Sequence, residues 1–201
     1  IDGKPARVRT VMSVRLVAKP LPDNNFDVRI AAADFGAPGE DEFVSTGKPL
    51  RRPRYPEQAA MSGVRGTVYV IVRVGRDGKV QDAMAEQVNL RVVDTESEMN
   101  RWRDMLADAT LATARKWTFV PPTKGEEVDA PFWLARVPVD YQMPNDEAPR
   151  PGRWEAYIPG PRQSAPWLGG MDTSLGADAV AGGGIFPLQG GPRLLTPLDG
   201  G

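Results

Sequence analysis

Valine at every second position, followed by an Asp-Gly pair, constrains this chain more than any other stretch. Residues 68–74 carry this alternation, and a two-residue period is typical of a β-strand whose two faces differ in burial. Asp77-Gly78 follows shortly afterwards and is a strong signal for a hairpin turn. The sequence therefore predicts an antiparallel strand pair, whose second strand runs from Lys79 to about Val88.

A long amphipathic helix is predicted after this strand pair. Thr95 and Glu98 have the spacing of a capping box, in which the threonine oxygen accepts a hydrogen bond from the amide three residues on. Apolar residues then recur every three or four positions, which places them on one stripe facing a core. Pro121-Pro122 prevents any continuation of the helix. The stripe comprises Met99, Trp102, Met105, Leu106, Ala109, Ala112 and the later Trp117.

A short helix before the valine strand and a strand after the long helix complete the pattern. Pro56 suits the first turn of the short helix, and Gly63 would end it in the left-handed conformation. Residues from Phe132 to Tyr141 alternate again, with Pro138 among them. Because proline cannot donate a ladder hydrogen bond, this strand is expected at a sheet edge. The order of elements predicts an α+β domain over residues 50–143.

Two further segments are predicted before this domain. Residues 1–35 alternate on both sides of a turn at Pro20–Asn25 and predict a β-hairpin. An isolated hairpin is only marginally stable in water, so this one should pack on something. One interpretation is that it is the end of a truncated repeat of the central domain. Residues 36–49 are acidic and rich in turn residues, which indicates a linker.

The last segment, residues 144–201, is a Pro/Gly-rich tail without periodicity. Short apolar clusters interrupt it, and two interpretations stay open. The clusters dock on a partner or on the domain itself, or the tail is disordered and its apolar residues are incidental. The clusters are Trp154–Ile158, Pro166–Leu168, Ile185–Leu188 and Leu194–Leu195.

The composition argues against an enzyme. Histidine and cysteine are both absent, which removes the commonest general base, the commonest zinc ligand and every thiolate metal site. The formal net charge is −1, and acidic and basic residues are interleaved, so no basic face suggests nucleic acid. We expect no catalytic residue, no cofactor, no metal site and no small-molecule substrate.

Five short motifs follow one another between residues 55 and 141. They are Tyr55-Pro56-x-x-Ala59, Gly63-x-x-Gly66-x-Val68, Asp77-Gly78-Lys79-Val80, Ala114-Arg115-Lys116-Trp117-x-Phe119-x-Pro121 and Val137-Pro138-Val139-x-Tyr141. In this order they resemble the TonB C-terminal domain family, the periplasmic end of the energy-transducing protein of bacterial outer-membrane transport. The resemblance covers about residues 50–143 and implies a three-stranded antiparallel sheet with two helices on one face. It also implies a periplasmic location, with any membrane anchor upstream of Ile1, where the chain looks processed or truncated.

The resemblance implies a way of binding as well as a fold. Such domains capture the TonB box, a short extended segment of an outer-membrane receptor, as an added β-strand. Here the implied docking edge is the strand from Phe132 to Tyr141, and the extended lead-in to the short helix is a second contact region. The implied partner-binding residues are Arg52, Pro53, Arg54, Tyr55, Phe132, Leu134, Arg136, Pro138 and Asp140.

Departures from the family pattern support a second hypothesis. A hairpin precedes the domain and a long tail follows it, although such a domain normally ends its chain. The protein would then be a non-transducing structural or accessory subunit of a cell-envelope complex, docking through its tail and N-terminal hairpin. A homodimer is kept as a further alternative for the partner.

Overall fold

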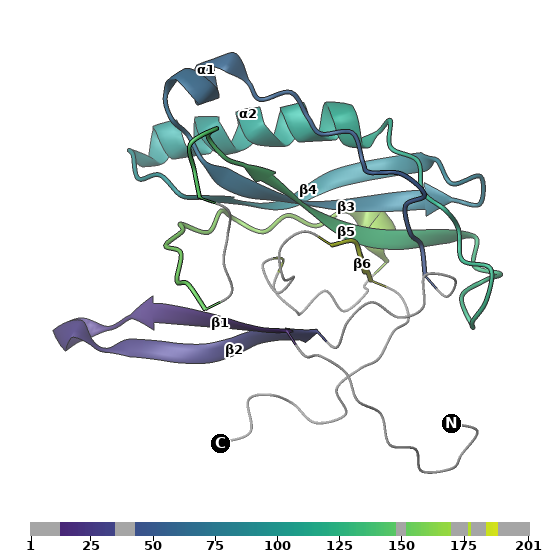
Figure 1. Ribbon diagram of the computed structural model, residues 1–201, viewed down its shortest axis with the longest axis horizontal. Coiled ribbons are helices and arrows are strands. Elements are labelled where there is room, and N and C mark those ends of the chain that lie inside the picture. The colour runs from purple at the N-terminus through teal and green to yellow at the C-terminus, as the bar shows by residue number, and fades with distance from the viewer. Residues whose placement is uncertain (1–12, 35–42, 148–151, 170–176, 178–183, 189–201) are drawn as a thin grey trace, which may run out of the picture.

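Two antiparallel sheets and two α-helices make up the described part of the chain. This computed structural model describes residues 13–34, 43–147, 152–169, 177 and 184–188 (Figure 1). The predicted α+β class is confirmed. The strands are β1 (Ser13–Pro20), β2 (Phe26–Asp34), β3 (Gly66–Gly75), β4 (Val80–Leu90), β5 (Phe132–Tyr141) and β6 (Phe186–Pro187), and the helices are α1 (Glu57–Met61) and α2 (Glu96–Ala114).

The main sheet has the strand order β4-β3-β5-β6, so the valine strand β3 lies inside it. The four valines of β3 are fully buried and face the helices. The predicted hairpin turn closes β3 onto β4, with a hydrogen bond of 2.9 Å from the Gly78 amide to the Gly75 carbonyl. Gly78 has φ +75°, a conformation that glycine adopts without steric cost. The strand pair predicted from the alternation is therefore confirmed.

Helix α2 packs its apolar stripe on the sheet, as its spacing predicts. Thr95 caps it by accepting a hydrogen bond from the Glu98 amide at 3.3 Å. Trp102 and Leu106 are buried on the stripe, whereas Ala112 is exposed and lies outside it. Figure 1 shows α1 and α2 together on one face of the sheet. The core on this face also holds Trp117, Trp133 and Tyr141.

The three-stranded sheet implied by the resemblance is too small, because the tail adds a fourth strand, β6. Described tail segments also lie across the face of the sheet opposite the helices (Figure 1). The physical reason is visible in β3, whose second face carries Tyr69 and Ile71, which are 4% and 0% exposed. A strand that is apolar on both faces needs cover on both.

The predicted N-terminal hairpin is confirmed for residues 13–34, where β1 and β2 pair antiparallel. A row of its apolar side chains stays 39–59% exposed. One of its links to the rest of the molecule is a hydrogen bond of 3.4 Å from Arg15 to the Tyr69 hydroxyl. The division into hairpin, linker, domain and tail stays a prediction. The exposed row is Val14, Leu16, Leu21, Phe26, Val28 and Ile30.

Candidate functional site

The outer edge of β5 is the candidate site, and one hydrogen bond shows which residues form it. The Leu188 amide donates to the Leu134 carbonyl at 2.9 Å, so the backbone groups of Leu134 point away from β3. Because these groups alternate in direction along an antiparallel strand, every second residue of β5 shares this orientation. The outward-facing residues are Phe132, Leu134, Arg136, Pro138 and Asp140, which are the five edge residues implied from the sequence.

Pro138 fits this edge without cost to the sheet. It lies opposite Tyr69 of β3, and its ring nitrogen occupies an outward-facing position. The donor that it lacks would therefore have pointed away from β3. Pro138 removes one donor from the outer edge and none from the β3–β5 ladder.

The centre of the edge already holds a strand of the same chain. Strand β6 pairs antiparallel with β5, placing Pro187 opposite Ala135 and Phe186 opposite Arg136. The registered pairs of β6 in the described chain do not extend to Pro138 or Asp140. A segment of the same chain thus pairs with the β5 edge that was implied from the sequence.

The side chains of the five edge residues differ in accessibility. Leu134 and Arg136 are 1% and 4% exposed, because described parts of the tail cover them. Phe132 is half-buried, with the Arg73 guanidinium 4.0 Å from its ring centroid. Asp140 is exposed and accepts a hydrogen bond of 2.5 Å from the Thr67 hydroxyl. Access to the central two side chains would require the tail to move.

The lead-in segment reaches the end of β5 through Tyr55. Its ring meets the Tyr141 ring edge-on, with 5.2 Å between centroids, and its hydroxyl donates to the Val64 carbonyl. Arg52 and Arg54 are exposed, and Pro53 is half-buried. The lead-in therefore contacts the far end of β5 through Tyr55. The Tyr55 side chain makes these contacts inside the domain.

A comparison with known families identifies this part of the chain. Residues 51–143 match the family described as the Gram-negative bacterial TonB protein C-terminal. The match covers a little under half of the chain, and we refer to residues 51–143 as the TonB C-terminal domain. No curated protein and no solved structure matches the chain.

The TonB C-terminal family consists of protein-interaction domains rather than enzymes, and it belongs to the Gram-negative envelope and periplasm. It implies protein partners such as outer-membrane receptors. Within the described residues, no helix combines the length and hydropathy needed to cross a bilayer.

A buried ion network joins the TonB C-terminal domain to the tail, and the sequence did not reveal it. The Glu86 carboxylate, 1% exposed, accepts hydrogen bonds from Arg136 at 2.6 and 2.9 Å. It also accepts from Arg162 of the tail at 2.6 and 3.0 Å. Arg136 is therefore an internal partner of Glu86 as well as an edge residue.

The tail is also held along the outer edge of β4. Leu90 and Ile158 exchange both backbone hydrogen bonds, at 3.0 and 2.7 Å, and the Gln163 amide donates to the Glu86 carbonyl at 2.7 Å. Gly160 sits so close to β4 that a Cβ there would lie 2.4 Å from the Val88 carbonyl oxygen. Tail residues 155–169, which we call the strap, thus cover the β4 edge and much of the second face.

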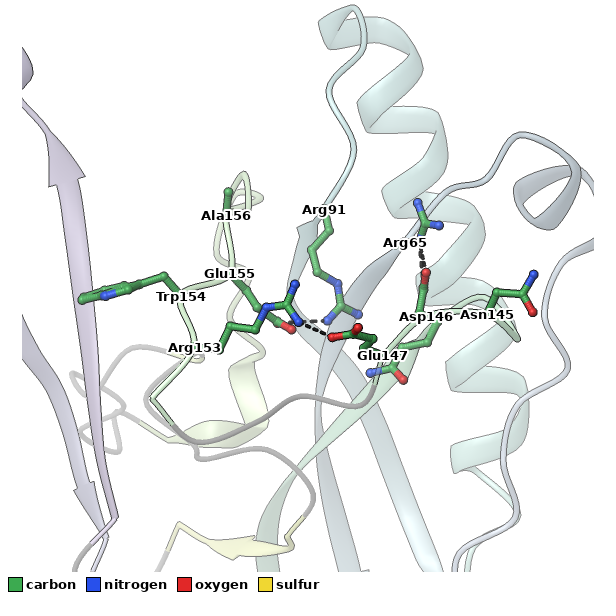
Figure 2. A pocket seen from close by; sticks show the side chains of 10 residues that line it. Arg65, Arg91, Asn145, Asp146, Glu147, Arg153, Trp154, Glu155 and Ala156 are labelled. Carbon is green, nitrogen blue, oxygen red and sulfur yellow. Dashed lines mark hydrogen bonds and ion pairs between the residues drawn. The ribbon is translucent and has the colours of Figure 1, made fainter.

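A charged pocket of about 380 Å³ lies where the strap meets the end of β5 (Figure 2). Arg65 pairs with Asp146 at 2.7 Å, and this hydrogen bond holds the pKa of the Asp146 carboxyl below its usual range. Arg91, 16% exposed at its side chain, pairs with Asp140 at 2.9 Å and with Glu155 at 3.5 Å. These ion pairs make the pocket a polar joint between domain and tail.

Two tyrosines, the buried Tyr141 and the half-buried Tyr55, make the stability of the domain sensitive to alkali. Burial raises the pKa of Tyr141 and of Tyr55 above 10.0. Their neutral forms are favoured in the folded state, so their contribution is complete below pH 10 and is lost as the pH rises through the folded-state pKa. We expect the free energy of unfolding, measured in urea, to fall above pH 10. The double variant Tyr55→Phe/Tyr141→Phe should lose less over the same range, and an equal loss would contradict this assignment.

Proposed function

We propose that the TonB C-terminal domain binds an extended peptide of an outer-membrane receptor as an added strand on β5, and that this link transmits energy for transport. The observation that carries the proposal is the pairing of β6 with β5. It supports a β5 edge whose outward backbone groups accept a strand in a defined register. Backbone pairing would supply affinity, and the side-chain positions along the edge would supply specificity.

The length of β5 supports this proposal. Strand β5 contains ten residues, whereas β6 contains two. A receptor peptide could therefore pair beyond the stretch that β6 covers, toward Pro138 and Asp140. The exposed cations Arg52 and Arg54 would offer charge to an acidic receptor segment. The alternative of an accessory subunit docking through its tail and N-terminal hairpin is weaker, because the described tail segments dock on the chain's own sheet.

The test uses synthetic TonB-box peptides and the full chain labelled with ¹⁵N. We expect saturable shifts of the backbone amides of Leu134, Arg136 and Asp140, with smaller shifts for amides that face β3, such as those of Ala135 and Val137. A matched peptide with proline at alternate positions should cause no shift, because it cannot donate to the edge. If the β5 amides stay unmoved, both in this chain and in one whose β6 is weakened, the proposed function is wrong.

A further inference from the structure

Two parts of the tail hold the domain with very different strength. The strap has reciprocal hydrogen bonds at Ile158, a charge-assisted contact from Arg162 and a buried anchor in Leu168, 5% exposed. By contrast, the described residues give β6 two registered residue pairs and a further hydrogen bond from the Leu188 amide. All residues from Gly184 to Leu188 are only half-buried. The described contacts that hold the strap are therefore more extensive than those that hold β6.

From this contrast we propose that Ile185–Leu188 is an exchangeable internal ligand of the β5 edge, whose release admits an external strand. The inference rests on the proposed function for the identity of that strand. It adds that the chain controls access to its own β5 edge. It also adds that the replacing strand must place apolar side chains where Phe186 and Leu188 now lie.

The side chains of the segment show what those positions require. Phe186 packs against buried Tyr69 and Ala177. Leu188 packs in the cluster that contains Ile71 and Leu134. These two residues are separated by one position, so both point to the second face of the sheet.

The intervening residue, Pro187, alternates with them in backbone direction. Its missing amide therefore faces away from β5, and no ladder bond is lost. A strand that replaces this segment is expected to carry bulky apolar side chains two residues apart, with little constraint on the residue between them.

The strap helps to form the receiving surface. Trp167 and Leu168 belong to the same cluster as Leu134 and Leu188, so the apolar patch lies between the strap and the edge of the sheet. This patch would remain in place when β6 leaves, because the Glu86 network and the β4 edge hold the strap separately. The domain would therefore offer a formed patch to an incoming strand.

Tethering makes this internal ligand an effective competitor. A segment tethered to its own domain has an effective concentration on the order of millimolar. If its own affinity for the edge is about 0.1 mM, the edge is free about one-tenth of the time, and an external peptide binds about tenfold more weakly. Even weak contacts of β6 are thus sufficient to control the access of an external peptide to the β5 edge.

The experiment measures this competition with the segment's own sequence as probe. A fluorescently labelled synthetic peptide of residues 183–190 is titrated into the full chain and into the variant Phe186→Ser/Leu188→Ser. We expect the variant to bind the labelled peptide about tenfold more tightly, since its edge is free. A labelled peptide carrying the same two serines should not bind either chain. Trp154→Ser, which changes an exposed tail aromatic away from β6, should match the unmodified chain.

A second variant guards against a folding defect. Leu188→Pro removes the amide that donates to Leu134 together with the leucine side chain, and it should also raise affinity for the labelled peptide. Equal affinities in all chains, or no binding to either variant, would overturn the proposal. TonB-box peptides then separate the two claims. If the TonB-box peptides displace the labelled peptide, the proposed function and the proposed exchange are both supported. If the labelled peptide binds but the TonB-box peptides bind neither the unmodified chain nor the variant, the proposed function is wrong and the proposed exchange is retained.

Discussion

Glu86→Gln should lower the free energy of unfolding by about 3–5 kcal/mol, which is the usual cost of removing one partner from a buried ion pair. The variant side chain keeps its size but loses its charge. Arg136, 4% exposed, would then be a buried cation without its carboxylate. Part of the tail's attachment through Arg162 would be lost as well. Urea denaturation at pH 7, followed by circular dichroism, measures the change.

Two control variants show whether the loss comes from burial. Glu98→Gln breaks the exposed pair with Arg101, 3.6 Å apart, and should change stability by no more than about 0.5 kcal/mol. Glu86→Leu/Arg136→Met removes both buried charges together, and it should recover most of the stability because no fully buried charge is left without a partner. Arg162 also loses the Glu86 carboxylate, but its side chain is 35% exposed. If the double variant is as unstable as Glu86→Gln, the explanation by an uncompensated charge is wrong.

Leu106→Ala should cost about 2–5 kcal/mol. Leu106 is 0% exposed on the buried stripe of α2, within the cluster that includes the valines of β3. The truncation removes apolar contacts and leaves a cavity between helix and sheet. Thermal and urea unfolding both measure the loss.

Leu106→Met is the matched control, because it changes the shape of the side chain while nearly conserving its volume. It should cost less than about 1.5 kcal/mol. Equal losses in the two variants would show that the position is sensitive to shape rather than to cavity volume. A loss below about 1 kcal/mol in Leu106→Ala would contradict the packing of α2 described above.

Elements with a local signal were predictable. The β3–β4 turn depends on Asp77-Gly78, and the start of α2 depends on Thr95 and Glu98, which are close in the sequence. The prediction that β5 is the edge strand was wrong in part, because β6 lies beyond β5 in the strand order. Pro138 indicated only that its own outward backbone position needs no ladder donor. The apolar clusters of the tail were recognised, and three of the four contact the domain at Ile158, Leu168 and Phe186. The fourth, Leu194–Leu195, lies outside the described residues.

The contacts of the candidate site were less predictable, because they join residues far apart in the chain. Glu86 lies 50 positions from Arg136 and 76 from Arg162, and no local period relates them. The partner-binding role implied for Arg136 did not include its burial against Glu86. The sequence held one usable signal, the apolar residues on both faces of β3, which indicate that the second face needs cover.

The sequence by itself determined the order of strands and helices, the turn and the cap, the absence of histidine and cysteine chemistry, and the family of residues 51–143. Each depends on residue identity or on spacing along the chain. Only the tertiary structure decided what covers the second face of the sheet and what occupies the β5 edge. Backbone groups at a sheet edge are alike in every strand, so their partner is determined by which distant segment the fold brings beside them.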